Sequence, residues 1–292
     1  MSAPALSESD TRITITRRTA RWDDREVTVA DAMDFWSFAA GAANVVMQLA
    51  LPGVGHGVAE SVVESGSLMH HPWKRARTTF SYLAVAILGT QEDKAAYREA
   101  VNGAHRQVRS TPESPVQYNA FDRDLQMWVA ACLFVGLGDT YQLLRGQLTP
   151  QAAEDFYRSA FTLGTTLQVT EDQWPPTRAA FDEYWNSACA RVSMDDTVRD
   201  YLTDLINLRM ITPLLRPGYV PLLKFLTTGF LAPVFRDALG VTWSPRRQKW
   251  FERLFLFVAL VNRFLPKFIR QGGSQLLLTD IRIRVRRGKR LI

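Results

Sequence analysis

Apolar residues recur at helical spacing along most of the chain, between signals that start and stop helices. Pro72 opens such a run and Gly89 ends it, the usual placement of proline in the first turn and glycine just past the last. Thr90 then caps the next helix, with Asp93 at the capping-box position. Together the patterns predict an all-α fold, a single multi-helix domain. Further helices are predicted over residues 118–144, 149–163, 176–192, 195–209, 219–239 and 244–268.

The stretch after Asp31 is apolar on all sides up to Leu49 and stops before Pro52-Gly53, which predicts a buried central helix. Its small residues at 39–43 would let another helix or a flat cofactor approach closely, and helix packing is the favoured interpretation. Strand-like alternation occurs only in Ile-Arg-Ile-Arg-Val-Arg at 281–286, which is too isolated to build a sheet.

The composition supports a large core, since 47% of the 292 residues are hydrophobic. Residues 1–27 hold no apolar stretch long enough for a signal peptide, and we expect a flexible segment there. A helical domain over 28–270 and a basic tail over 271–292 are expected to follow. Cys132 and Cys189 lie in apolar helical patterns with no partner at metal spacing, so we expect buried thiols in a reducing, cytoplasmic compartment.

Positive charge is concentrated near the C-terminus. Thirteen Lys and Arg residues stand between Arg246 and Arg290 against only Glu252 and Asp280, although the whole chain has a net charge of +6. The apolar stretches at 218–235 and 254–261 are shorter than the ~20 residues that span a bilayer. Flanking cations would attract anionic headgroups by about 1 kcal/mol each, so peripheral binding at the inner membrane face is one hypothesis. A core helix pair with a solvated basic rim is the alternative.

Nucleic-acid binding is not expected. Residues 281–290 would place arginines on one face of a strand, against phosphates, but no helix-turn-helix or stacking platform accompanies them. The chain also shows no glycine-rich phosphate loop and no nucleophile elbow, which excludes many common enzyme classes.

Two helical segments carry candidate site residues. His105 stands in Val-Asn-Gly-Ala-His-Arg-Gln-Val-Arg at 101–109, and a single imidazole suffices as proximal ligand of haem iron; an ordinary, partly buried histidine is the alternative. Arg75 and Thr79, four residues apart, share one helix face and could clamp a carboxylate or hydrogen-bond an oxygen. The alternative for these two is a solvated basic turn.

The other histidines offer weaker candidates. His56, Glu60 and Glu64 repeat at four-residue spacing and could form a non-haem metal face, although such a row is more often a solvated helix face. His70 and His71 precede Pro72 in a loop, where we expect them to contact water.

Four short stretches, taken in their order and spacing, resemble one known family. They are Met47-Gln-Leu-Ala-Leu-Pro-Gly-Val-Gly55, Lys74-Arg-Ala-Arg-Thr-Thr-Phe80, residues 101–109, and Tyr118-Asn-Ala-Phe-Asp-Arg-Asp-Leu-Gln-Met-Trp-Val-Ala-Ala-Cys132. The chain is similar over 38–190 to the MpaB and rubber oxygenase (latex clearing protein) catalytic-domain family, whose members are helical haem-b proteins.

The resemblance implies roles for particular residues. His105 matches the histidine that binds haem iron from the proximal side, and Arg75 and Thr79 match residues near the haem on the other side, where they would take part in catalysis. Asn102 and Arg109 would face the cofactor edge or its propionates.

The chain also departs from the family pattern at three positions. Thr78 stands where rubber-cleaving members have a lysine near the iron, Ala130 replaces the histidine of a Trp-Val-His motif, and Leu51 replaces another frequent histidine. Polyisoprene cleavage is therefore not carried over, whereas haem binding through His105 is.

The sequence thus predicts a haem-b-dependent oxygenase that uses dioxygen to oxidise an apolar, lipid- or terpenoid-like small molecule. No cysteine lies in a ligand context, which favours histidine-ligated chemistry over thiolate-type hydroxylation. The alternative is a non-enzymatic haem-binding or peripheral membrane-associated helical protein, which oxygen-dependent turnover would exclude.

Overall fold

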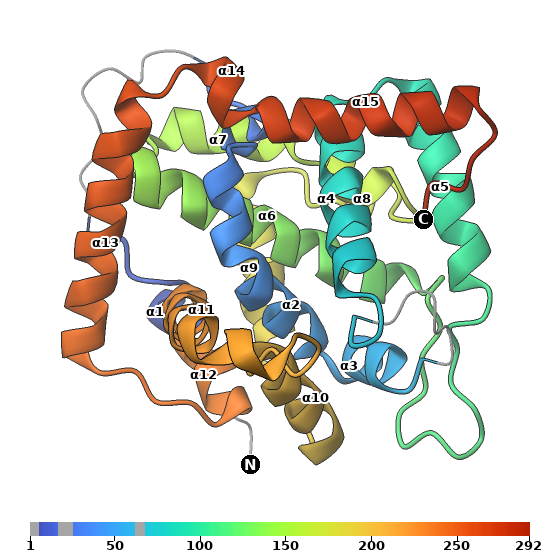
Figure 1. Cartoon of the computed structure of the whole chain (residues 1–292), viewed down its shortest axis with the longest axis horizontal. Coiled ribbons are helices and arrows are strands. Elements are labelled where there is room, and N and C mark those ends of the chain that lie inside the picture. The colour runs from blue at the N-terminus through green and yellow to red at the C-terminus, as the bar shows by residue number, and fades with distance from the viewer. Residues whose placement is uncertain (1–5, 17–25, 62–67) are drawn as a thin grey trace.

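Helices make up the fold, and most of them begin at the signals in the sequence. The computed structural model describes residues 6–16, 26–61 and 68–292. Within these ranges there is no strand, and Arg109 and Asn119 form one isolated bridge, so the predicted all-α fold is confirmed. The helices, seen in Figure 1, are α1 (Glu8–Thr11), η1 (Val29–Ala32), η2 (Phe35–Ala40), α2 (Gly41–Leu49), α3 (Pro52–Ala59), α4 (Pro72–Leu88), α5 (Gln91–His105), α6 (Arg123–Arg145), α7 (Pro150–Ser159), α8 (Thr162–Thr165), α9 (Arg178–Cys189), α10 (Asp196–Ile206), η4 (Pro213–Leu215), α11 (Arg216–Phe230), α12 (Pro233–Leu239), α13 (Pro245–Phe264), α14 (Lys267–Arg270) and α15 (Gly272–Arg286).

Prolines and caps set the boundaries that the periodicity left open. α4 has the predicted bounds, and the Thr90 hydroxyl accepts from the Asp93 amide to start α5. The predicted helices over 219–239 and 244–268 are each broken, before Pro233 and at Pro266. α6 begins later than predicted, because the Asp122 carboxylate caps it.

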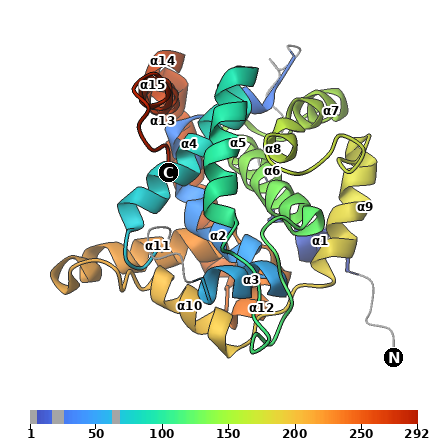
Figure 2. The same cartoon turned by 90° about the vertical axis from the view of Figure 1, so that its right-hand side faces the viewer.

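α6 forms the centre of the molecule, with other helices on its sides (Figures 1 and 2). The Trp128 ring stacks on Trp185 of α9 at 5.2 Å, and Phe134 lies edge-on to Phe181 at 4.7 Å. In the described part of the chain α6 is long and apolar enough to cross a membrane, and the bent pair 35–49 and 52–59 passes the same test. Because 83% of the apolar stretch of α6 is buried in the protein, it has the character of a core helix.

The segment predicted as one central helix after Asp31 is divided. η1 and η2 are 3₁₀ turns, and the α-helix starts only at Gly41. The buried Asp34 carboxylate between the two turns accepts hydrogen bonds from Arg145, Asn262 and Arg270, which fixes the backbone there in a non-helical conformation. The small residues of this segment do serve helix packing, since α2 lies against α6.

The alternating residues 281–286 are helical, so their interpretation as a strand is wrong. They lie in α15, which crosses α4 and packs against it, with Leu278 and Ile281 buried (Figure 1). Arg282 binds Asp93 at 2.8 Å and Arg284 binds Asp280 at 2.7 Å. The segment expected to be a basic tail therefore begins with a docked helix, and two of its arginines are paired within the protein.

Residues near the N-terminus also contact the core. The Trp185 indole donates to the Thr11 carbonyl at 3.0 Å, and Arg12 binds Asp182 at the same distance. Cys132 and Cys189 are both buried free thiols, as the pattern predicts.

Candidate functional site

α4 and α5 form a helical hairpin, and the start of α4 and the end of α5 both lie away from the turn that joins them. Gly89 and Thr90 make the turn between them, and the Tyr97 hydroxyl donates to the Thr78 carbonyl at 2.6 Å across the pair. Arg75 lies in the first turn of α4 and His105 is the last residue of α5, so both stand at the ends of these helices away from the turn.

His105 is half-buried, with its ring edge-on to Phe121 at 6.2 Å between centroids. Its Nδ1 atom is fully enclosed and has no hydrogen-bond partner among the described residues. Burial and the nearby positive charge of Arg75 lower the pKa of His105 to about 4. The imidazole is therefore neutral at physiological pH, the state in which a ring nitrogen can donate its lone pair to a metal.

The Arg75 side chain is exposed, and its positive charge acts on two tyrosines as well as on His105. Burial raises the pKa of Tyr97 and of Tyr201 on α10, and the Arg75 guanidinium opposes both shifts. Arg75 thus lies within electrostatic range of His105 and of both tyrosines, and within the described residues it forms no ion pair. Such a guanidinium suits an anionic or oxygen-bearing ligand.

Thr78 and Thr79 use their hydroxyls locally. Both donate to the Arg75 carbonyl, at 2.9 and 3.0 Å. Thr78 is buried, whereas Thr79 is half-buried. Each hydroxyl keeps acceptor capacity, but its proton is directed at the backbone of α4.

Asn102 and Arg109 lie on either side of His105 along the chain, in different settings. The Asn102 amide oxygen accepts from Gln168 at 2.6 Å, which ties the last turn of α5 to the segment after α8. Arg109 is exposed and belongs to the bridge with Asn119 beyond the end of α5. Of the residues predicted from the sequence, Arg75 thus acts on His105 through its charge, Thr78 and Thr79 bond to the Arg75 carbonyl, and Arg109 lies in an exposed segment.

Two aromatic residues at this site were missed in the sequence. Phe121 lies just before α6 within a stretch that had been noted only for its resemblance, and Tyr201 comes from α10, about a hundred residues further along. No local pattern marks Tyr201, because only the tertiary fold brings it within range of the Arg75 charge.

His56 is buried, and the interpretation of its row as a solvated helix face is wrong for this residue. Its Nδ1 lies 2.6 Å from Glu60 Oε1 and its Nε2 lies 2.9 Å from Asp195 Oδ2, the cap of α10. Glu64, the third member of the proposed metal face, lies outside the described residues. His70 and His71 are exposed. In the part of the chain that is described, no three His, Cys, Asp or Glu side chains form a group that could hold a metal ion.

The partly exposed Glu60 carboxylate completes this cluster around the buried His56. Ser114 and Tyr118 donate to its other oxygen at 2.8 and 3.1 Å. Burial opposes ionisation of Glu60, but the hydrogen bonds from Ser114, His56 and Tyr118 outweigh it and lower the pKa of Glu60. The cluster joins α3, α10 and the loop after α5, and both ring nitrogens of His56 lie against a carboxylate.

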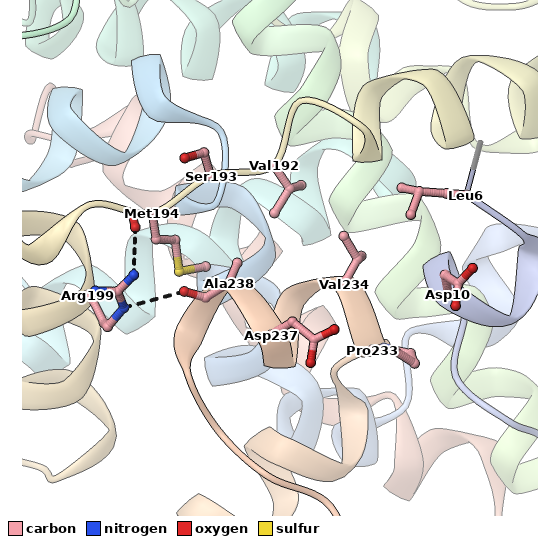
Figure 3. A pocket seen from close by; sticks show the side chains of 10 residues that line it. All are labelled: Leu6, Asp10, Val192, Ser193, Met194, Arg199, Pro233, Val234, Asp237 and Ala238. Atoms are coloured by element: carbon pink, nitrogen blue, oxygen red, sulfur yellow. Dashed lines mark hydrogen bonds between the residues drawn. The ribbon is translucent and has the colours of Figure 1, made fainter. Parts of the chain in front are cut away.

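A pocket of about 420 Å³ lies elsewhere, between α1, α10 and α12 (Figure 3). Two of its charged side chains are engaged: Arg199 donates to the Met194 carbonyl at 2.8 Å and binds Asp196 at 2.7 Å, and Asp10 accepts from Ser7. None of the sequence-predicted site residues lines it. We therefore assign the candidate site to the α4–α5 hairpin.

Comparison with known proteins agrees with the family that the sequence motifs indicate. The chain is 49% identical over 251 residues to the uncharacterized protein Mb2261 of Mycobacterium bovis and, equally, to the uncharacterized protein Rv2237 of Mycobacterium tuberculosis. Each match covers 86% of this chain and 98% of the relative. No solved structure matches the chain. The family model for the catalytic domain of ER-bound oxygenase mpaB/B' and rubber oxygenase matches residues 30–260, which include the whole α4–α5 hairpin, and the chain belongs to that family.

Proposed function

We propose that the protein binds haem b through His105 and oxidises an apolar, lipid- or terpenoid-like substrate with dioxygen. The observation that carries the proposal is the neutral imidazole at the end of α5, whose Nδ1 atom is enclosed, within range of the positive charge of Arg75. Membership in an oxygenase family supports the reaction class.

The residues at the hairpin fit one axial ligand and one anionic contact. We assign His105 Nε2 as the ligand atom, because Nδ1 is enclosed. A pKa of about 4 keeps the ring free to coordinate above mildly acidic pH. Arg75, without an ion pair among the described residues, suits a propionate carboxylate or a bound oxygen atom.

Haem, when bound, supplies the redox chemistry of the reaction. The chain's own residues set the orientation of the ring and the polarity around it. Phe121 packs against the edge of the His105 ring, and Asn102, one turn earlier, fixes the end of α5 through Gln168. Both act on His105 as positioning residues.

In this proposal Arg75 is the residue that donates hydrogen bonds to the substrate or to a bound oxygen atom. The Thr79 proton is directed at the Arg75 carbonyl, so Thr79 would have to give up that bond before it could donate to a ligand. Thr78, at the position of the family lysine, is buried and similarly bonded. The reaction of this chain would therefore proceed without a cation at position 78, which argues for a substrate other than polyisoprene.

The groups around the site favour an apolar substrate. Phe121 packs against the His105 ring, and Tyr97 and Tyr201 lie within range of the Arg75 charge. Aromatic lining with few polar groups is typical of sites that take hydrophobic small molecules.

The visible absorption spectrum after haem reconstitution tests the proposal. We expect a Soret band in the wild-type protein and its loss in His105→Ala, with unchanged helical circular dichroism in both. His71→Ala, an exposed histidine at the start of α4, is the matched control and should keep the band. A band of wild-type intensity in His105→Ala would contradict the axial assignment.

Activity is measured separately as oxygen uptake with an apolar terpenoid or unsaturated lipid. We expect Arg75→Met to bind haem about tenfold more weakly or to turn over more slowly, because it loses a charge-assisted hydrogen bond. A haem-loaded wild-type protein that consumes no oxygen with such substrates would leave the non-enzymatic, haem-carrying alternative.

A further inference from the structure

The outward face of α13 is apolar, although its inward face already packs in the core. Phe251, Phe255 and Val258 are buried on the inner side. On the outer side five large apolar residues, and Phe268 of the adjoining α14, keep between 56% and 77% of their surface exposed. We call these six the α13 face: Trp250, Leu256, Phe257, Leu260, Phe264 and Phe268.

The α13 face is one continuous stripe. Phe257, Leu260 and Phe264 follow each other at three- and four-residue steps, so their side chains line up along the helix, and Phe268 comes just after the break at Pro266. α13 and α14 run along one outer edge of the molecule (Figure 1). Contiguous exposed apolar surface of this kind marks a site that is covered by another body.

Cations are interleaved with the apolar side chains. Lys249, Arg253 and Arg263 are exposed on α13, and the Arg253 guanidinium lies 5.7 Å from the centre of the Trp250 ring. Glu252 is the single acidic residue of this helix, and it is turned partly inward and accepts from Gln248. Long basic side chains beside apolar ones can keep their charges at a polar boundary while their neighbours leave water.

This charge pattern favours a membrane over a second copy of the chain as the partner that covers the α13 face. A second copy would bring two positive faces together, which repel. A membrane surface with anionic headgroups offers negative charge at the boundary and hydrocarbon just below it, which matches both features of the face.

We propose that the α13 face binds the surface of an anionic membrane, with α13 lying in the plane of the headgroups. Trp250, Phe257 and Phe264 enter the acyl boundary, and Lys249 and Arg253 contact phosphate groups. The proposal does not depend on haem binding, and the membrane would be the source from which an apolar substrate is drawn.

Co-sedimentation of the full chain with lipid vesicles tests this. One set of vesicles is pure phosphatidylcholine, and the other contains about 30 mol% phosphatidylglycerol, enough to give an anionic surface. We expect binding to the anionic vesicles, weaker binding to the neutral ones, and release from the anionic vesicles in high salt. No binding to anionic vesicles would overturn the proposal.

Variants locate the contact. Phe257→Ser combined with Phe264→Ser should weaken vesicle binding by about tenfold or more, because two apolar side chains no longer leave water. Leu214→Ser on η4, which removes an equally exposed apolar residue away from the α13 face, is the control and should bind like the wild type. Circular dichroism checks that each variant is folded.

Two further outcomes would overturn the assignment. If the double variant binds vesicles as well as the wild type, another surface is responsible. If light scattering shows a wild-type dimer that the double variant dissociates, the face binds a second copy instead. The charge variant Lys249→Glu with Arg253→Glu should lose the preference for anionic vesicles.

Discussion

The Arg282 guanidinium binds the carboxylate of Asp93 at 2.8 Å, and the same carboxylate accepts from the backbone amide of Thr90 at the start of α5. The C-terminal helix is thereby attached to the helix that carries His105. The capping box and the ion pair share one side chain, so the start of α5 depends on a residue about 190 positions away.

Asp93→Ala should lower the free energy of unfolding at pH 7 by about 1–2 kcal/mol, the usual effect of losing a helix cap. Burial opposes ionisation of Asp93, but hydrogen bonds from Arg282 and Thr90 outweigh it and lower its pKa. The contribution is therefore present above the unfolded value of 3.8 and is lost as the pH falls through the lower folded pKa. Urea unfolding at pH 7 and at acidic pH measures this. A variant with an unchanged midpoint at pH 7, like the exposed control Arg290→Ala, would contradict it.

His56→Ala should destabilise the protein strongly, by roughly 3 kcal/mol. The substitution opens a cavity and leaves Glu60 and Asp195 without the ring that lies between them. The measurement is chemical unfolding followed by circular dichroism. His71→Ala, an exposed histidine, is the control and should change stability by less than about 0.5 kcal/mol. A small effect of His56→Ala would show that the cluster contributes little.

Gly136→Ala and Gly138→Ala, two residues apart on α6, should change stability in opposite directions. A Cβ at Gly136 would overlap the amide of Asn44, which donates to the Cys132 carbonyl at 2.6 Å, so we expect a loss of about 1–3 kcal/mol. A Cβ at Gly138 would meet the Phe156 ring at an ordinary 3.7 Å, and the alanine should stabilise the helix by about 0.5–1 kcal/mol. Thermal unfolding of the two variants tests this prediction. Equal effects on stability would contradict the close approach of α2 to α6 at Gly136.

Asp139→Asn should stabilise the protein at pH 8 by roughly 2 kcal/mol. Burial raises the pKa of Asp139 to about 6, although Arg12 and Arg178 oppose the shift. Between the unfolded value of 3.8 and about 6 the folded state binds more protons, so the stability of the wild type falls as the pH rises through this window. The asparagine variant should lack that fall. Unfolding titrations across pH 4–8 compare the two, and parallel profiles would contradict the prediction.

Local signals in the sequence predict much of the helical structure. Pro72, Gly89 and the Thr90–Asp93 pair act within one or two turns, so α4 begins and ends where their side chains dictate. The division of the segment after Asp31 was not predictable in this way. It follows from Asp34, whose partners Arg145 and Arg270 are brought in by helices far along the chain.

The residues of the candidate site also divide into those that the sequence predicts and those that only the fold identifies. His105 and Arg75 stand in short motifs that resemble a known family, and the hairpin that turns at Gly89 keeps His105 within range of the Arg75 charge. Tyr201 and the His56–Asp195 contact join segments more than a hundred residues apart, and no periodicity or spacing marks such pairs.

By itself, the sequence determined the helix content, the family motifs and the hairpin that carries Arg75 and His105. Caps, prolines and apolar periodicity are local properties, and each acts on residues within a few turns of it. Only the tertiary structure decided which faces are covered. Alternation over 281–286 is also compatible with a helix. The packing of α15 against α4, which buries Leu278 and Ile281, selects that helix. The equally apolar outer face of α13 is covered by no helix within the described chain. Burial is a property of the assembled fold, since the same apolar residue is stabilising only where another element excludes water from it.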